Sequence, residues 1–197
     1  MKAILIFFSL LLVTVAFLCT PLAVEAALVS KVLIEGETQG KIEGSCDSSF
    51  DCDGWIAAYS FGHNVYIPRD AQNNITGKRV HTPLKILKSF DKSTPKLYQA
   101  LINGEQLEIT MRFYKVDPSG IEENYFTITL KKALIISITP SYPPVFLPQN
   151  NSYHHMETVA FIYQYIKWTW ESDGIESEDS IGSSEQMATD RNAQLRQ

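Results

Sequence analysis

The stretch from Leu107 to Ile138 constrains the fold most, because apolar residues recur at alternate positions on both sides of a turn. Large apolar residues alternate with polar ones from Leu107 to Phe113, and Asp117 to Gly120 then supplies the turn. The apolar phase of the second half consists of Phe126, Ile128, Leu130, Leu134, Ile136 and Ile138. A period of two buries one face of a strand, so a β-hairpin in a mainly β chain is predicted.

Other segments support a mainly β chain. Trp55 to Ile67 and Arg79 to Phe90 carry the β-branched and aromatic residues typical of strands, and Pro68 to Asn74 is rich in turn formers. A last long strand is expected from Glu157 to Trp170, with apolar or aromatic residues on both faces. Both faces are therefore expected to be covered, either by a neighbouring subunit or within the monomer.

One short helix is predicted between Asp91 and Gly104. Thr94 can cap it, Pro95 suits the first helical position, and Gly104 ends it. Helical spacing gives it a narrow apolar face made of Leu97, Ala100 and Leu101.

The N-terminal segment has the layout of a secretory signal. Lys2 precedes an apolar run from Ala3 to Phe17, and small residues precede an expected cut after Ala26. An uncleaved anchor is the alternative, since the apolar stretch approaches the roughly 20 residues that span a bilayer. The expected segments are a signal peptide at 1–26, a barrel domain at 27–170 and a tail at 171–197.

Cys46 and Cys52 are the cysteines that remain after loss of residues 1–26. An even pair in an exported chain predicts a disulfide, and two free thiols are the alternative. No second close pair of Cys or His completes a tetrahedral set in the sequence, so neither a metal nor another cofactor is predicted.

The residues after Trp170 account for the whole net charge of −5, because they include seven acidic and two basic side chains. The body is formally neutral and lacks the clustered Lys and Arg that nucleic-acid binding requires. The tail, 171–197, has almost no large hydrophobic residues and is predicted to be disordered.

The sequence contains no Gly-x-Ser-x-Gly elbow, no His-Glu-x-x-His and no phosphate-binding glycine loop. His154 and His155 are expected at the surface, because neighbours in a strand point to opposite faces. His81 is expected to be a hydrogen-bonded structural histidine. No catalytic residue is therefore predicted, and the chain is not expected to be an enzyme.

Several stretches, in order, resemble the Hcp family, the tube protein of type VI secretion systems (hemolysin-coregulated protein). They are Val32 to Gly40, Gly77 to Pro83, Asp91 to Pro95, Glu123 to Leu130 and Phe161 to Trp170. The resemblance covers nearly all of the expected body. It implies a closed antiparallel β-barrel of two sheets with one short helix.

The resemblance also implies a structural function. Family members form hexameric rings that stack into a tube, which is surrounded by a sheath, capped by a spike protein and loaded with effectors. In the family a long loop contacts adjoining subunits, and the matching stretch here is Asn64 to Gly77. The assembly candidates within it are Tyr66, Ile67, Pro68, Arg69 and Asp70. Such a contact, repeated by rotation, closes a ring.

Three features depart from the family pattern: the signal, the tail and the Pro-rich stretch from Pro140 to Pro148, which is expected to be a loop or an edge. Family members ordinarily assemble in the cytoplasm, whereas a signal predicts a periplasmic or secreted protein. Cytoplasmic tube assembly before secretion is expected if the signal is not used. The alternative function is an exported monomeric β-barrel binding module related to the tube protein.

Overall fold

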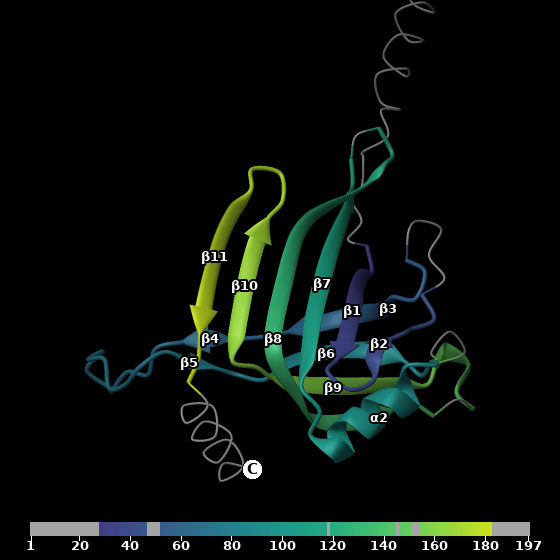
Figure 1. The fold of residues 1–197 in the computed structure, drawn as a ribbon, viewed down its shortest axis with the longest axis horizontal. Coiled ribbons are helices and arrows are strands. Elements are labelled where there is room, and N and C mark those ends of the chain that lie inside the picture. Colours follow the sequence, from purple (N-terminus) through teal and green to yellow (C-terminus); the bar gives the residue numbers. More distant parts are fainter. Residues whose placement is uncertain (1–27, 47–51, 118, 145, 151–153, 183–197) are drawn as a thin grey trace, which may run out of the picture.

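The computed structural model describes residues 28–46, 52–117, 119–144, 146–150 and 154–182. The predicted signal peptide lies outside these ranges. Strands make up most of the described elements (Figure 1). They are β1 Ser30–Gly36, β2 Gly40–Ile42, β3 Ile56–Gly62, β4 Val65–Tyr66, β5 Val80–His81, β6 Leu84–Ser89, β7 Leu107–Val116, β8 Glu122–Ser141, β9 Met156–Ile162, β10 Tyr165–Trp170 and β11 Ile175–Ser180. The helices are α2 Thr94–Asn103 and the 3-10 helix η1 Pro148–Asn150.

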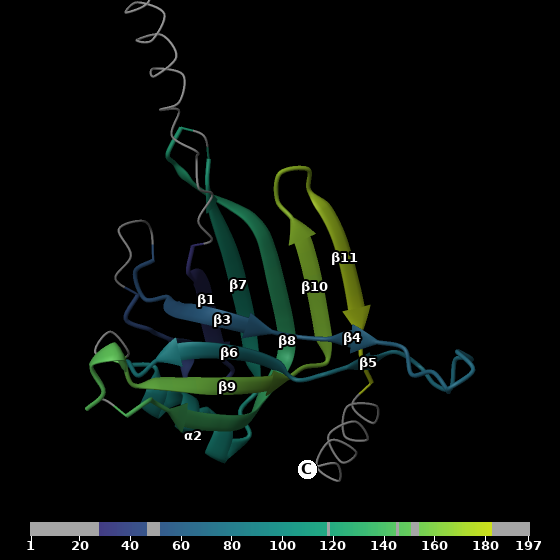
Figure 2. The same ribbon diagram turned by 180° about the vertical axis from the view of Figure 1, so that it is seen from behind.

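Six strands close into an antiparallel barrel in the order β8, β7, β1, β3, β6 and β9, with β9 returning to pair with β8. Strands β10 and β11 extend the sheet beyond β8, and β4 with β5 forms a small second sheet. In Figures 1 and 2, β7, β8, β10 and β11 run side by side, while β3, β6 and β9 run across them. For the residues that the structure describes, a closed antiparallel barrel with a second sheet and one α-helix is therefore confirmed.

Alternate side chains of the barrel strands fill its interior. The predicted alternation of β7 is present from Leu107 to Met111, where every second residue is buried. Val32, Ile34 and Phe161 lie in the same core with no exposed surface. Each fully buried side chain of this kind stabilises the fold by about 1.5–3 kcal/mol, so this core holds the barrel together.

Strand β8 leaves its predicted phase at Lys132, whose φ is 49°. The step from Leu130 to Ala133 on β8 spans three residues, but it lies opposite only two residues of β7, so β8 contains one extra residue. Beyond this bulge the side chains exchange faces. Ala133 and Ile135 are buried, whereas Ile136 is 39% exposed, so the predicted phase was wrong from Ala133 to Ile136. After a second irregularity at Ile135, Ile138 packs against the core as predicted.

The long strand predicted from Glu157 to Trp170 is divided into β9 and β10. The end of β9 and the start of β10 share one register against β8, with Ile162 opposite Leu134 and Tyr165 opposite Lys131, and the register of β9 shifts by one residue between Ile135 and Ser137. The break faces the bulge in β8, so the sheet turns a corner there, and β9 runs across the direction of β10 in both views. At its far end β8 continues to Ser141 and pairs with β9.

Strand β11 corrects the prediction that the whole tail is disordered. Gly174, with a φ of 64°, lies in the turn after β10, and β11 then pairs with β10 from Ile175 to Ser180. Its side chains are mostly exposed. A strand with few apolar residues is ordered here because β10 supplies both a backbone ladder and charged partners, including Lys167 at 2.9 Å from Glu176.

The helix ends as predicted but begins differently. Gly104 adopts a left-handed conformation with a φ of 61°, and its N–H bonds the last carbonyls of α2. The N-cap is Ser93, without a side-chain capping bond, so Thr94 is the first helical residue and Pro95 the second. Leu97 lies against the barrel core. Within the described ranges, no helix has the length and apolar character needed to cross a membrane.

Candidate functional site

A narrow arm, defined here as residues 64–82, projects from the barrel and contains β4 and β5 (Figures 1 and 2). Its base is closed by Thr82, whose N–H donates to the Asn64 carbonyl at 2.9 Å. Its tip is organised by Asp70, which accepts hydrogen bonds from the backbone N–H and side-chain amide of Asn74 at 2.8 and 2.9 Å. These bonds lower the pKa of Asp70 and give the tip a defined turn.

The arm exposes apolar side chains to solvent. Tyr66 and Ile67 are each 45% exposed, Val65 is 42% exposed and Ile75 is 67% exposed. Grouped apolar side chains on a projecting element are typical of contact surfaces between proteins. Of the predicted assembly residues, Tyr66 and Ile67 therefore supply apolar area. Pro68, Arg69 and Asp70 lie nearer the tip, where Arg69 pairs with Ile75 and Asp70 shapes the turn.

A group of polar side chains, of which His81 and Tyr163 are buried, lies where the arm joins the barrel. We call it the anchor cluster, and it consists of His63, Arg79, His81, Tyr163 and Asp179. The Tyr163 hydroxyl lies 2.6 Å from Nε2 of His63 and 2.8 Å from Nδ1 of His81. Nε2 of His81 lies 3.0 Å from Oδ2 of Asp179, which also binds Arg79. The cluster thus joins the arm, the corner before β10, and β11.

With both histidine rings neutral, one pattern of protons satisfies the cluster. Because a carboxylate only accepts, Nε2 of His81 carries a proton and donates it to Asp179. Neutral His81 then accepts at Nδ1 from the Tyr163 hydroxyl, whose oxygen accepts from Nε2–H of His63. In this pattern the hydrogen bonds run in one direction, from His63 to Asp179.

The electrostatic environment favours these neutral rings. Burial, with a smaller contribution from His81, lowers the pKa of His63 to about 4. Burial also lowers the pKa of His81, although Asp179 favours its charged form. Hydrogen bonds from Arg79 lower the pKa of Asp179, which stays ionised. His81 and Tyr163 are only 4% and 1% exposed, so the cluster is built to hold segments together rather than to meet a substrate.

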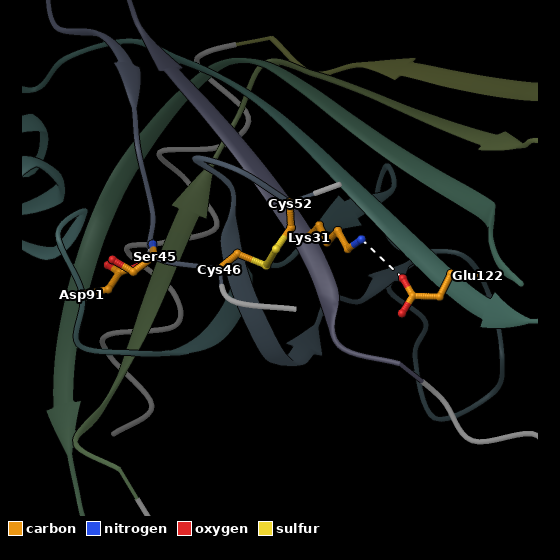
Figure 3. Close-up of a disulfide and its surroundings, with 6 residues drawn as sticks. All are labelled: Lys31, Ser45, Cys46, Cys52, Asp91 and Glu122. Atoms are coloured by element: carbon orange, nitrogen blue, oxygen red, sulfur yellow. Dashed lines mark hydrogen bonds and ion pairs between the residues drawn. A yellow bond between two sulfur atoms is a disulfide. The ribbon is translucent and has the colours of Figure 1, made fainter. Parts of the chain in front are cut away.

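The cysteine segment lies elsewhere, beside β1 and the loop before α2. Cys46 and Cys52 are joined by a disulfide, and the N–H of Ser45 donates to Oδ2 of Asp91 at 2.9 Å (Figure 3). In the same view the Lys31 ammonium faces Glu122 at 3.5 Å. The disulfide therefore joins Cys46, which follows β2, to Cys52, which precedes β3.

The sequence indicated the arm and a hydrogen-bonded His81, but neither the role of His63 nor the partners of the two rings. Arg79 was assigned only to a strand, and Asp179 was placed in a disordered tail. A signal for β11 was present, since Asp173-Gly174 directly after a strand is a hairpin turn sequence. Among the residues that the structure describes, no three His, Cys, Asp or Glu side chains are grouped to hold a metal ion.

Comparison with known proteins shows which family has this architecture. The family model described as "Type VI secretion system effector, Hcp" matches residues 33–170. The "Major exported protein" of Pseudomonas aeruginosa is 38% identical over 126 residues, which are 63% of this chain and 73% of that protein. A crystal structure of an Hcp protein has a TM-score of 0.75 at 28% identity, covering 80% of this chain and 99% of that one. The secreted protein Hcp3 from Pseudomonas aeruginosa has a TM-score of 0.64 at 29% identity, covering 80% and 100%. This chain therefore belongs to the Hcp family of type VI secretion systems.

Proposed function

We propose that this chain is a structural subunit that assembles with copies of itself into hexameric rings, which stack into a tube, and that it catalyses no reaction. The exposed apolar arm carries this proposal. A subunit that offers one surface to a different surface of the next copy forms a closed ring when the rotation is right. Val65, Tyr66, Ile67 and Ile75 supply such a surface, and the anchor cluster holds it in place.

The family membership gives the proposal its partners. The stacked rings would lie inside a contractile sheath beneath a spike protein and would carry effector cargo. Nothing in the charge pattern of the chain suits nucleic acid. His81 and Tyr163 at the centre of the anchor cluster are buried, which supports a structural role for the polar groups that the fold brings together.

We further propose that the protein is exported, with residues 1–26 removed as a signal peptide. Two observations support export: the relative named "Major exported protein" and the disulfide between Cys46 and Cys52, a bond that persists in oxidising compartments. Intact mass spectrometry of the protein, expressed with its own N-terminus in cells that can export it, gives the site of cleavage. A mass that includes Met1 would contradict removal of the segment.

The arm variants Ile67→Asp and Ile75→Asp test the assembly contact. Each places a charge where the proposal buries an apolar side chain, so the equilibrium between subunits and rings should shift toward monomers by at least about tenfold. Ile102→Asp is the matched control, because Ile102 is 79% exposed on α2, away from the arm. Sedimentation velocity separates the species. Rings that survive in both arm variants would rule out the arm as the contact.

A further inference from the structure

The arm has little structure of its own to fix its direction. Its sheet consists of two residue pairs, Val65 with His81 and Tyr66 with Val80, and one isolated bridge lies nearer the tip. A two-stranded hairpin alone is at best marginally stable in water. The direction in which the arm projects must therefore be set by contacts outside it.

Such contacts come from β11. Arg79 binds both carboxylate oxygens of Asp179 and also donates from Nη2 to the Ser180 carbonyl at 2.8 Å. His81 adds a third point of attachment through Nε2, 3.0 Å from Asp179. A two-pronged arginine–carboxylate pair restrains orientation as well as distance. The Asp179 side chain is 22% exposed, so this pair is less screened than a fully exposed one.

Strand β11 is attached to the barrel independently of the arm. Ile181, just beyond it, is 8% exposed within the hydrophobic core, and its N–H donates to the Gln164 carbonyl at 2.8 Å. The Tyr165 hydroxyl donates to Glu178 at 2.6 Å, in addition to the ladder between β10 and β11. Loss of the Asp179 contact would therefore leave β11 in place and remove support from the arm alone.

We propose that Asp179 is a positioning residue for assembly, through which β11 holds the arm in the direction that the contact between subunits requires. The inference rests on the proposed function in taking the arm as the contact surface. It adds that a strand from the C-terminal part of the chain governs that surface from behind, without touching the neighbouring subunit. Asp179 is thus a residue whose loss should impair ring formation although the apolar side chains of the arm are unchanged.

Hydrogen exchange of the arm tests this directly. The Asp179→Ala variant is compared with the chain that keeps Asp179. Both proteins also carry Ile67→Asp, so that assembly between subunits does not protect the arm. Peptides covering residues 64–82 should exchange about tenfold faster in the Asp179→Ala protein, because local opening becomes easier. The matched control is Glu178→Gln, the neighbouring residue on β11, which should leave exchange of the arm unchanged. Arm peptides that exchange equally in all three proteins would overturn the proposal.

A double-mutant cycle shows whether Asp179 acts through Arg79. Arg79→Ala together with Asp179→Ala should loosen the arm by less than the sum of the two single changes, since the contact between these residues is already lost in each of them. If Asp179→Ala does not fold, Asp179→Asn keeps the shape of the side chain and serves in its place. If Asp179→Ala loosens the arm but the parent chain never forms rings, the result would support positioning and contradict the proposed function. A chain that forms rings with an unaffected arm would contradict positioning alone.

Discussion

Lys88 and Glu157 face each other inside the end of the barrel, with Nζ 2.6 Å from Oε1 and no exposed surface on either side chain. Lys88 also lies 3.0 Å from Oδ1 of Asp91, and the Thr94 hydroxyl donates to Oε1 of Glu157 at 2.8 Å. The pair therefore ties β6, β9 and the start of α2 together. The hydroxyl predicted to cap the helix serves this network instead.

Replacing one member of this pair should destabilise the fold strongly. Lys88→Met leaves a buried carboxylate without its cation, and we expect a loss of about 3–5 kcal/mol in the free energy of unfolding. Lys88→Met combined with Glu157→Leu removes both charges and should recover most of that loss. Urea unfolding of the parent, the Lys88→Met variant and the double variant measures these free energies of unfolding. A single variant as stable as the parent would show that the pair contributes little.

Removing the disulfide should weaken the fold moderately. Cys46 and Cys52 are six residues apart, so the bond closes a short loop. Loop-closure entropy predicts that Cys46→Ser with Cys52→Ser lowers the free energy of unfolding by about 2 kcal/mol. The reductant dithiothreitol should lower the unfolding midpoint of the parent protein and leave that of the serine variant unchanged. Equal midpoints in oxidised and reduced parent protein would contradict the prediction.

The neutral histidines of the anchor cluster should make stability depend on pH. The pKa of His63 is lowered from 6.5 to about 4 in the folded chain, so above pH 4 the unfolded chain binds protons that the folded chain does not. The stability that this provides is complete above about pH 6.5 and is lost as the pH falls toward about 4. Arg79, Asp179 and Tyr163 surround the two rings. Because the pKa of Asp179 is itself lowered, the stability that its carboxylate contributes is lost only at a lower pH.

His63→Phe isolates this contribution. As the pH falls from 6.5 to about 4, the free energy of unfolding should fall by about 1–2 kcal/mol less in the variant than in the parent. This figure allows for the partial exposure of the His63 ring. His154→Gln is the control, since His154 is exposed and lies outside the cluster. Denaturant unfolding at a series of pH values gives the curves. Parallel curves for His63→Phe and the parent would show that His63 is not the source.

The left-handed end of α2 gives a local test of the backbone. Gly104 has a φ of 61°, so Gly104→Ala should cost about 1 kcal/mol of stability from backbone strain. Gly62→Ala is the matched control, because a Cβ at Gly62 meets no atom within 4 Å and the residue lies in an extended strand. Thermal unfolding compares the two. Equal melting temperatures would contradict the role of Gly104.

The local pattern of the sequence was enough for the elements whose cause is local. The hairpin around Asp117, the helix ending at Gly104 and the alternation from Leu107 to Met111 all follow from periodicity and turn chemistry. The phase of β8 after Lys132 did not follow, because a bulge depends on how two strands meet at a corner rather than on the residues of one strand.

The candidate site was predictable only in part for the same reason. The arm is a local turn-rich segment, and its assembly candidates came from the resemblance to the Hcp family. Asp179 lies about a hundred residues from Arg79 and His81, and composition alone placed it in a disordered segment. A strand such as β11 is ordered by pairing with β10 and by charged partners, which hydrophobic content does not report.

The most direct test of the account is the native mass of the chain from Ala27 onward, purified with its disulfide intact. We expect a hexamer that dissociates to monomers in the Ile67→Asp variant and remains a hexamer in the Ile102→Asp variant. A parent chain that stays monomeric at high concentration and low salt would contradict ring assembly and favour a monomeric barrel.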